Sequence, residues 1–155
     1  MPEFPALPED ELWMQRAIVC AEHAARAGEV PVGAMIVQNG QCIVEAGNAP
    51  IALSDPTAHA EIQALRQAGQ VQRNYRLVDC TLYVTLEPCI MCVGALIHAR
   101  VVRVVFGASD PRTGALTSVF TLGDSPQLNH QLSWTKGVLA APCAALLKEF
   151  FKVRR

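Results

Sequence analysis

Cysteine and histidine side chains in the middle of the sequence have the types and spacing of a metal site. Cys89 and Cys92 stand at positions i and i+3 in the first turn of a predicted helix, which places both sulfurs on one face. The positive end of the helix dipole there favours deprotonated sulfur. A CxxC pair alone is also compatible with a redox pair, half of a structural zinc site or chance. His59, thirty residues before Cys89, supplies a third candidate ligand and weakens the redox interpretation.

Three ligands of this kind would leave one corner of a tetrahedral zinc ion open. A structural site would normally fill that corner with a fourth protein ligand. None of the remaining cysteines has a spacing that suggests this role; they are Cys20, Cys42, Cys80 and Cys143. An open corner holds a water molecule, whose pKa zinc lowers to about 7. The pattern therefore predicts a site that makes hydroxide.

Glu61 is the candidate proton carrier, because a carboxylate two residues from a ligand is close enough to touch the bound water. In a regular helix, however, residues i and i+2 point to nearly opposite sides. Both side chains can reach the metal only if His59 lies in an irregular first turn or Glu61 folds back. The alternative is an ordinary surface glutamate, and a structure with Glu61 pointing away from the metal would exclude the catalytic role.

The elements that must position these residues include four predicted helices. Apolar residues recur at helical spacing in the segments 9–27, 54–69, 88–99 and 140–153. In the second segment we expect Asp55 to cap the helix, Pro56 to stand in its first turn and Gly69 to end it. A loop is expected to precede this helix. The ligand candidates then fall near the starts of two helices.

Strand-like runs surround these helices. Two runs within 30–48 are joined by Asn39 and Gly40, the preferred filling of a two-residue hairpin turn. Strands over 81–87 and 101–108 enclose the helix with the cysteines, and such a βαβ unit predicts that the two strands are parallel. A loop-rich stretch over 109–131 and a short strand near 132–135 complete an α/β pattern.

The composition fits one domain over residues 1–155. A hydrophobic content of 51% and a charged content of 17% exclude a disordered or coiled-coil protein. Charged and polar residues interrupt every apolar run, so no window resembles a membrane span. The N-terminus is acidic and rich in proline, unlike a signal peptide. Six cysteines without such a signal predict reduced thiols and a cytoplasmic location.

The net charge of −1 conceals an asymmetry between the two halves of the chain. Residues 1–77 hold 5 basic and 9 acidic residues, whereas residues 78–155 hold 8 and 5. Lys152, Arg154 and Arg155 stand beside two phenylalanines. These cations are either a solvated helix end or a small patch that meets a polyanion.

The motif H-x-E followed by P-C-x-x-C is the signature of the zinc nucleobase deaminases. It is present here as His59-Ala60-Glu61 and Pro88-Cys89-Ile90-Met91-Cys92. Within that superfamily the chain resembles the bacterial tRNA-specific adenosine deaminases from Leu12 to Arg155. The most specific stretches are EVPVGA (29–34), DPTAHAEI (55–62), NYRL (74–77), LYVTLEPC (82–89), FGA-x-D-x-x-TGA (106–115) and CAALL-x-x-FF (143–151).

The resemblance implies a cytidine-deaminase-like α/β fold with three layers, in which a central mixed five-stranded sheet has helices on both faces. It implies one Zn²⁺ per subunit between two helix N-termini, and a homodimer with the active site near the subunit interface. The implied substrate is the wobble adenosine of a tRNA anticodon stem-loop, converted to inosine after the base is splayed into the pocket. Glu61 would take a proton from the zinc-bound water and deliver protons to N1 and the departing amine.

The resemblance also implies substrate contacts, each with a simpler alternative. Asn48 would hydrogen-bond the base, or merely form a turn after Gly47. Apolar wall positions, which could also be plain core residues, are Val30, Pro31 and Leu86. The backbone amides of Ala60 and Cys89 would support the site. Loop positions expected near the nucleotide, or otherwise needed only for loop structure, are Asp110 and Asn129.

Three positions depart from the family pattern and remove cationic or stacking surface near the expected RNA groove. Gly47 replaces a tryptophan, Ala49 a basic residue and Ser109 an arginine, while Arg112 keeps a positive charge. Three other functions stay open. They are deamination of a free nucleobase or nucleoside of the guanine or cytosine type, a non-catalytic zinc-stabilised RNA-binding or partner subunit, and a thiol oxidoreductase using the CxxC pair.

Overall fold

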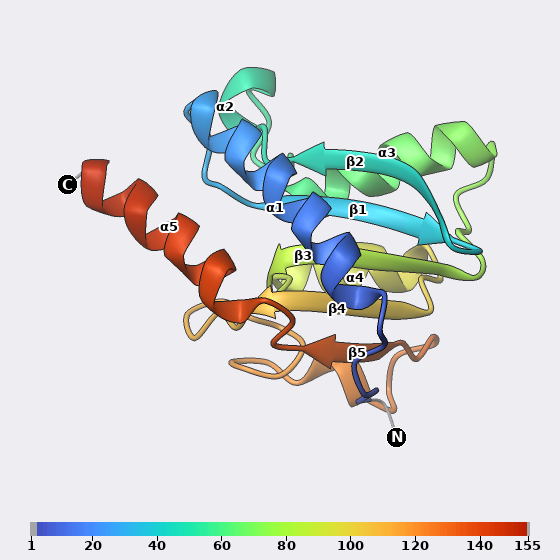
Figure 1. Ribbon diagram of the computed structural model, residues 1–155. Coiled ribbons are helices and arrows are strands. Elements are labelled where there is room, and N and C mark those ends of the chain that lie inside the picture. Colours follow the sequence, from blue (N-terminus) through green and yellow to red (C-terminus); the bar gives the residue numbers. More distant parts are fainter. Residues whose placement is uncertain (1–2, 155) are drawn as a thin grey trace.

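The computed structural model describes residues 3–154 and centres on a five-stranded sheet with the order β2-β1-β3-β4-β5 (Figure 1). The strands are β1 (Gly33–Gln38), β2 (Gln41–Gly47), β3 (Cys80–Leu86), β4 (Arg103–Ala108) and β5 (Ser133–Lys136). β1 runs antiparallel to both β2 and β3, whereas β3, β4 and β5 are mutually parallel. The predicted mixed five-stranded sheet is confirmed.

Helices cover both faces of this sheet. They are α1 (Asp10–Arg26), α2 (Pro50–Leu53), α3 (Ala60–Gln72), α4 (Ile90–His98) and α5 (Ala140–Arg154), with a 3-10 turn η1 (Leu122–Asp124). α1 and α5 contact each other on one face, and α3 and α4 contact each other on the opposite face (Figure 1). No helix within residues 3–154 has the length and apolar character needed to cross a membrane.

The local signals for the strands are confirmed. Asn39 and Gly40 join β1 to β2 and have φ angles of 51° and 73°. Positive φ at both central residues is what the tight hairpin turn requires. The pairing of β3 with β4 is parallel, as the βαβ pattern predicted. The sheet therefore brings the carboxyl ends of β3 and β4 to the same edge, next to the start of α4.

The predicted helix over 54–69 was wrong at both ends. Asp55 accepts hydrogen bonds from the backbone N–H and the hydroxyl of Thr57 at 2.8 and 2.7 Å, so its carboxylate closes a local turn instead of capping a helix. α3 begins only at Ala60, and Gly69 lies within it. The preceding stretch, expected to be a loop, contains the short helix α2, whose C-cap residue Ser54 has a left-handed φ of 51°.

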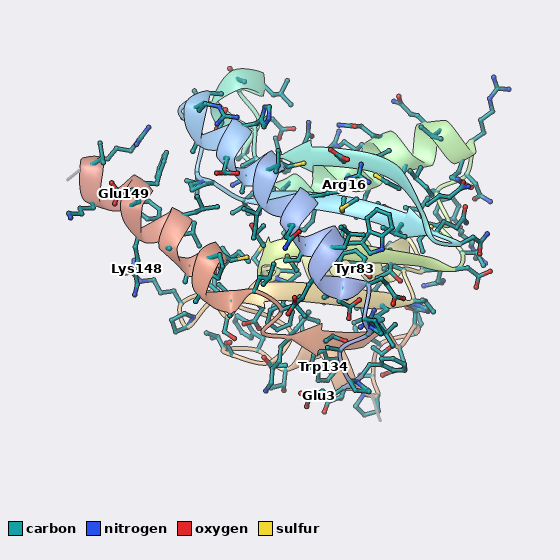
Figure 2. All side chains as sticks on the ribbon, viewed as in Figure 1. Glu3, Arg16, Tyr83, Trp134, Lys148 and Glu149 are labelled. Atoms are coloured by element: carbon teal, nitrogen blue, oxygen red, sulfur yellow. The ribbon has the colours of Figure 1, made fainter. Side chains whose placement is uncertain are left out.

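The core has two layers, one on each side of the sheet. Along β3, Leu82 and Val84 pack toward α3 and α4. Tyr83 packs toward α1 on the other face (Figure 2). Beside α1, the buried Arg103 guanidinium donates to both oxygens of Asp10 at 3.0 and 2.7 Å. The Tyr83 hydroxyl donates to Asp10 at 2.8 Å. This polar network ties α1 to the central strands.

Candidate functional site

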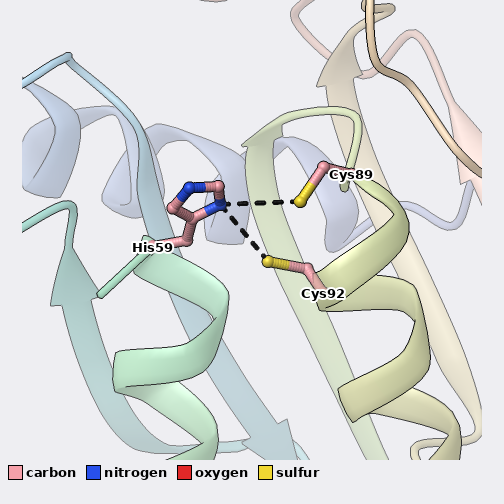
Figure 3. Close-up of side chains that lie close together, drawn as sticks. All are labelled: His59, Cys89 and Cys92. Carbon is pink, nitrogen blue, oxygen red and sulfur yellow. Dashed lines mark hydrogen bonds between the residues drawn. The ribbon is translucent and has the colours of Figure 1, made fainter. Parts of the chain in front are cut away.

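The three predicted ligands lie at the N-termini of two neighbouring helices (Figure 3). His59 is the N-cap residue of α3 and Cys89 the N-cap residue of α4, and both have extended backbone conformations. Cys92 follows in the first turn of α4 and is fully buried. Because α3 and α4 pack side by side on one face of the sheet, their first turns bring the imidazole and both sulfurs together.

The spacing of the ligand atoms fits zinc. The Sγ atoms of Cys89 and Cys92 each lie 3.6 Å from Nδ1 of His59, and all three ligand atoms lie within 4.8 Å of one another. Tetrahedral bonds of ordinary Zn–S and Zn–N length separate adjacent ligand atoms by about 3.5 Å. No further histidine, cysteine or carboxylate within residues 3–154 joins this cluster. The donor set therefore matches a three-ligand zinc site with one open position.

The electrostatics of the cysteine pair also suit a cation. The hydrogen bond with Cys92 lowers the pKa of Cys89 to about 4 against the effect of burial, and His59 acts in the same direction. The same hydrogen bond, together with burial, raises the pKa of Cys92. The pair thus holds one thiolate readily, and a bound cation would stabilise the second.

Glu61 lies in the first turn of α3 with only 4% of its surface exposed. Its carboxylate is in hydrogen-bond contact with the Cys92 thiol, and the charges of His59 and Cys89 act on it. Burial raises the pKa of Glu61 to about 7, although its own backbone N–H and His59 oppose this shift. Since His59 precedes the helix in an extended conformation, the opposite-face rule for i and i+2 does not apply to the pair. His59 thus lies outside the regular helix, which is one of the two arrangements under which both side chains could reach a metal.

Asn48 has a structural partner that the sequence did not reveal. Its side-chain oxygen accepts a hydrogen bond from the Ala60 backbone N–H at 2.7 Å. Asn48 thus caps α3 from twelve residues away, where a helix leaves its first N–H groups without partners within the helix. The Ala60 amide, expected to support the substrate, is engaged by Asn48. The cap fixes the backbone next to His59.

The predicted wall residues gather at the same edge of the sheet as the ligands. Val30 and Pro31 precede β1, and Leu86 ends β3. These chain ends are adjacent, because the Gly33 N–H donates to the Thr85 hydroxyl at 3.1 Å. Val30 and Leu86 are half-buried and Pro31 is buried.

The predicted loop residues are less closely connected to the cluster. The Asp110 carboxylate accepts hydrogen bonds from the N–H groups of Arg112 and Thr113 at 2.9 and 3.2 Å and from the Thr113 hydroxyl at 2.8 Å. It therefore shapes its own turn. Asn129 is exposed in the loop that precedes β5. No hydrogen bond in the described part of the chain joins either side chain to the ligands.

The departures from the family pattern also have definite positions. Gly47 ends β2 directly against α1, where a Cβ atom would lie 3.2 Å from the Cys20 oxygen and 3.3 Å from the Ala24 Cβ. A large side chain at this position would press on α1. Ser109 is exposed after β4, and Arg112 is exposed in the following turn.

Glu87 is a buried residue of this region that sequence reasoning did not single out. It is 2% exposed and lies between the end of β3 and Pro88. Burial acts to raise its pKa, but hydrogen bonds from Ser118 and the amides of Thr117 and Asp110 lower it overall. The sequence pattern that could have identified Glu87 is a charged residue at the end of an apolar strand, directly before a metal-ligand motif.

Comparisons with known proteins agree with this geometry. Residues 7–108 match the family described as the cytidine and deoxycytidylate deaminase zinc-binding region. The chain is 51% identical over 147 residues to the tRNA-specific adenosine deaminase of Haemophilus influenzae, covering 94% of this chain and 85% of that protein. It is 45% identical over 145 residues to the tRNA-specific adenosine deaminase of Aquifex aeolicus, covering 94% and 95%.

A solved structure from a study of A-to-I editing by tRNA A34 deaminases at the wobble position has the same fold. It superposes with a TM-score of 0.85 at 39% identity, covering 88% of this chain and 99% of that one. The family predicted from the motif is confirmed, as is the zinc-binding cluster of His59, Cys89 and Cys92. The chain belongs to the cytidine and deoxycytidylate deaminase family, together with the tRNA-specific adenosine deaminases.

Proposed function

We propose that this protein converts adenosine to inosine at the wobble position of a tRNA anticodon, with the whole chain acting as one deaminase domain. The observation that carries the proposal is the cluster of His59, Cys89 and Cys92 with the buried Glu61 carboxylate beside Cys92. The relatives named as tRNA-specific adenosine deaminases, which match almost the full length, support the substrate.

Glu61 is the proposed proton carrier. A zinc ion held by His59, Cys89 and Cys92 would supply a water molecule of lowered pKa to attack C6 of the adenine. Glu61 accepts the proton of that water and delivers protons to ring N1 and to the departing amine. Its burial favours this role, because a carboxyl whose pKa is raised to about 7 can both accept and release a proton near neutral pH.

The substrate contacts follow from the positions around this carboxylate. Val30, Pro31 and Leu86 would wall an apolar slot for the flipped base, since they gather at the sheet edge next to the ligands. Asn48 already uses its oxygen to cap α3, so its amide nitrogen would be the group that meets the base. Asp110 and Asn129 would contact the nucleotide or its neighbours from the loops.

The basic end of α5 supports an RNA partner. The Arg154 guanidinium lies 3.6 Å from the centre of the Phe150 ring, so this cation is held on an aromatic face. Lys152 and Arg154 are exposed. Arg155 lies outside the described residues. Exposed cations of this kind suit a phosphate backbone. A tRNA substrate would also place the enzyme in the cytoplasm.

We also propose a homodimer with the active site near the interface. Ile90 is 55% exposed in the first turn of α4, directly after the ligand Cys89. Isoleucine surface next to a metal site is the kind of apolar area that a second copy would cover. Light scattering of the wild type and of Ile90→Glu tests this, and a monomeric wild type would contradict it.

The function is tested by incubating the zinc-loaded protein with an anticodon stem-loop RNA and, separately, with free adenosine, guanine and cytosine. We expect inosine at the wobble position and no turnover of the free compounds. The matched control is Glu61→Gln, which should retain zinc and lose at least about 100-fold in rate. Turnover of a free base without inosine in the RNA would support the nucleobase deaminase alternative instead. Full activity of Glu61→Gln would exclude the proposed proton carrier.

A further inference from the structure

We propose that Glu87 is a positioning residue that fixes the loop of residues 109–120 beside the metal centre, so that binding of the RNA substrate depends on it. This inference rests on the proposed function, because it assigns that loop to substrate binding. The hydrogen bonds of the Glu87 carboxylate go to the loop and not to His59, Cys89 or Cys92. It acts through the loop that it holds.

The Glu87 carboxylate is surrounded by hydrogen-bond donors from the loop. One oxygen accepts from the Asp110 N–H at 3.1 Å and from the Ser118 hydroxyl. The other oxygen accepts from the N–H groups of Leu116, Thr117 and Ser118 at 3.2, 2.8 and 3.0 Å. Hydrogen bonds to a buried charge are stronger than those between neutral groups. A single side chain thus holds both ends of the segment 110–118.

The backbone around Glu87 joins the end of β4 and the same loop to the segment that carries Cys89. The Glu87 N–H donates to the Ala108 carbonyl at 2.8 Å, and the Ala115 N–H donates to the Pro88 carbonyl at 2.9 Å. Pro88 directly precedes the ligand Cys89. A displacement of the loop would therefore also move the backbone next to Cys89.

The packing at Gly114 independently shows how closely the loop is fitted to this carboxylate. A Cβ atom at Gly114 would lie 2.5 Å from the Glu87 carboxyl carbon and from one of its oxygens, and 2.6 Å from the Asp110 carbonyl oxygen. These distances are shorter than any ordinary carbon contact. The loop can close over Glu87 only because residue 114 has no side chain.

The loop needs this anchor because its outer surface is open. Residues 109–120 contain no helix or strand, and Arg112 in this loop is exposed. Val119 and Phe120 are each 45% exposed. The apolar anchor of the loop is limited to Ala115 and Leu116, which are buried in the core, and its polar ends depend on the groups beneath them. Those groups are the Glu87 oxygens.

The decisive variant is Glu87→Gln. Glutamine keeps the volume but has one oxygen, and its NH₂ group would face the loop's N–H donors. With the zinc-loaded protein and an anticodon stem-loop, we expect KM to rise about 10- to 100-fold, as for the loss of hydrogen bonds to a charge, with kcat within about threefold. Zinc content should equal that of the wild type. Trypsin should cut the bond after Arg112 faster, with the fragments identified by mass spectrometry.

Two further variants protect the test against misfolding. Gly114→Ala forces a methyl group against the Glu87 carboxyl and should give the same rise in KM and the same faster cleavage. Ser118→Ala removes only the hydroxyl donor and should give a smaller effect of the same kind. The control is Gly69→Ala within α3, where the added carbon would meet only the Asn74 oxygen at an ordinary 3.6 Å. It should match the wild type.

Unchanged KM and unchanged cleavage after Arg112 in Glu87→Gln would overturn the proposal. A loss of zinc with a fall in kcat at constant KM would also overturn it, because Glu87 would then support the metal end and not the loop. Failure of the wild type to deaminate the RNA would refute the proposed function. In that case the cleavage rates of Glu87→Gln and Gly114→Ala still decide whether Glu87 anchors the loop.

Discussion

Replacing Asp10 with asparagine tests how far the buried polar network beneath α1 holds the fold together. The side chains of Asp10 and Arg103 are only 1% and 8% exposed. Asp10 accepts two hydrogen bonds from Arg103, one from the Tyr83 hydroxyl at 2.8 Å and one from the Leu7 N–H at 2.7 Å. Asparagine offers one oxygen in place of two and leaves the arginine charge buried without a counter-charge.

The expected cost is large. Removing one partner of a buried ion pair destabilises a protein by about 3–5 kcal/mol, because the other charge remains desolvated. For a domain of this size, each kcal/mol lowers the melting temperature by about 2–4 °C. Asp10→Asn should therefore melt roughly 6–20 °C below the wild type.

Urea unfolding at pH 7, monitored by circular dichroism, measures the difference in free energy of unfolding between Asp10→Asn and the wild type. The double variant Asp10→Asn with Arg103→Met removes the unpaired charge and should recover most of the lost free energy of unfolding. The matched control is Glu45→Gln, which breaks the exposed pair of Glu45 with Arg16 and should cost at most about 1 kcal/mol. If Asp10→Asn stays within about 1 kcal/mol of the wild type, the buried-pair argument is refuted.

Further outcomes follow from the same contacts. Burial acts to raise the pKa of Asp10, but Arg103, the Leu7 amide and Tyr83 outweigh burial and lower this pKa below 3.8. The stability that Asp10 contributes is therefore fully present above pH 4 and is lost on further acidification. In urea titrations, the difference in free energy of unfolding between the wild type and Asp10→Asn should become smaller below pH 4. Asn48→Ala removes the cap on Ala60 and should cost about 1 kcal/mol in urea unfolding, whereas Asn48→Asp keeps the acceptor and should remain stable while losing activity on the stem-loop. Gly33→Ala places a carbon 2.0 Å from the Ala17 oxygen and should unfold at lower urea than Gly69→Ala. Chelation should abolish deamination, and added zinc should restore it.

Local chemistry made much of the fold predictable. The Asn39-Gly40 pair predicted its hairpin turn, because few residues adopt left-handed backbone conformations at low cost. The strand–helix–strand pattern around Cys89 predicted parallel strands because the crossover has one favoured geometry. The helix start at Ala60 was missed because Asp55 has two competing uses, a cap and a local turn. Composition does not decide between them.

The spacing of His59, Cys89 and Cys92 determined the chemistry by itself, since ligand type and number define what a zinc site can do. Only the tertiary structure decided how the site is supported. It placed His59 outside the helical register, so the opposite-face rule for i and i+2 does not separate His59 from Glu61. It showed that the Asn48 side chain accepts a hydrogen bond from the Ala60 amide. It also showed that Glu87 binds a loop more than twenty residues further along the chain. These hydrogen bonds depend on which chain segments meet after the sheet has formed. A sequence pattern does not contain the spatial distances between such segments.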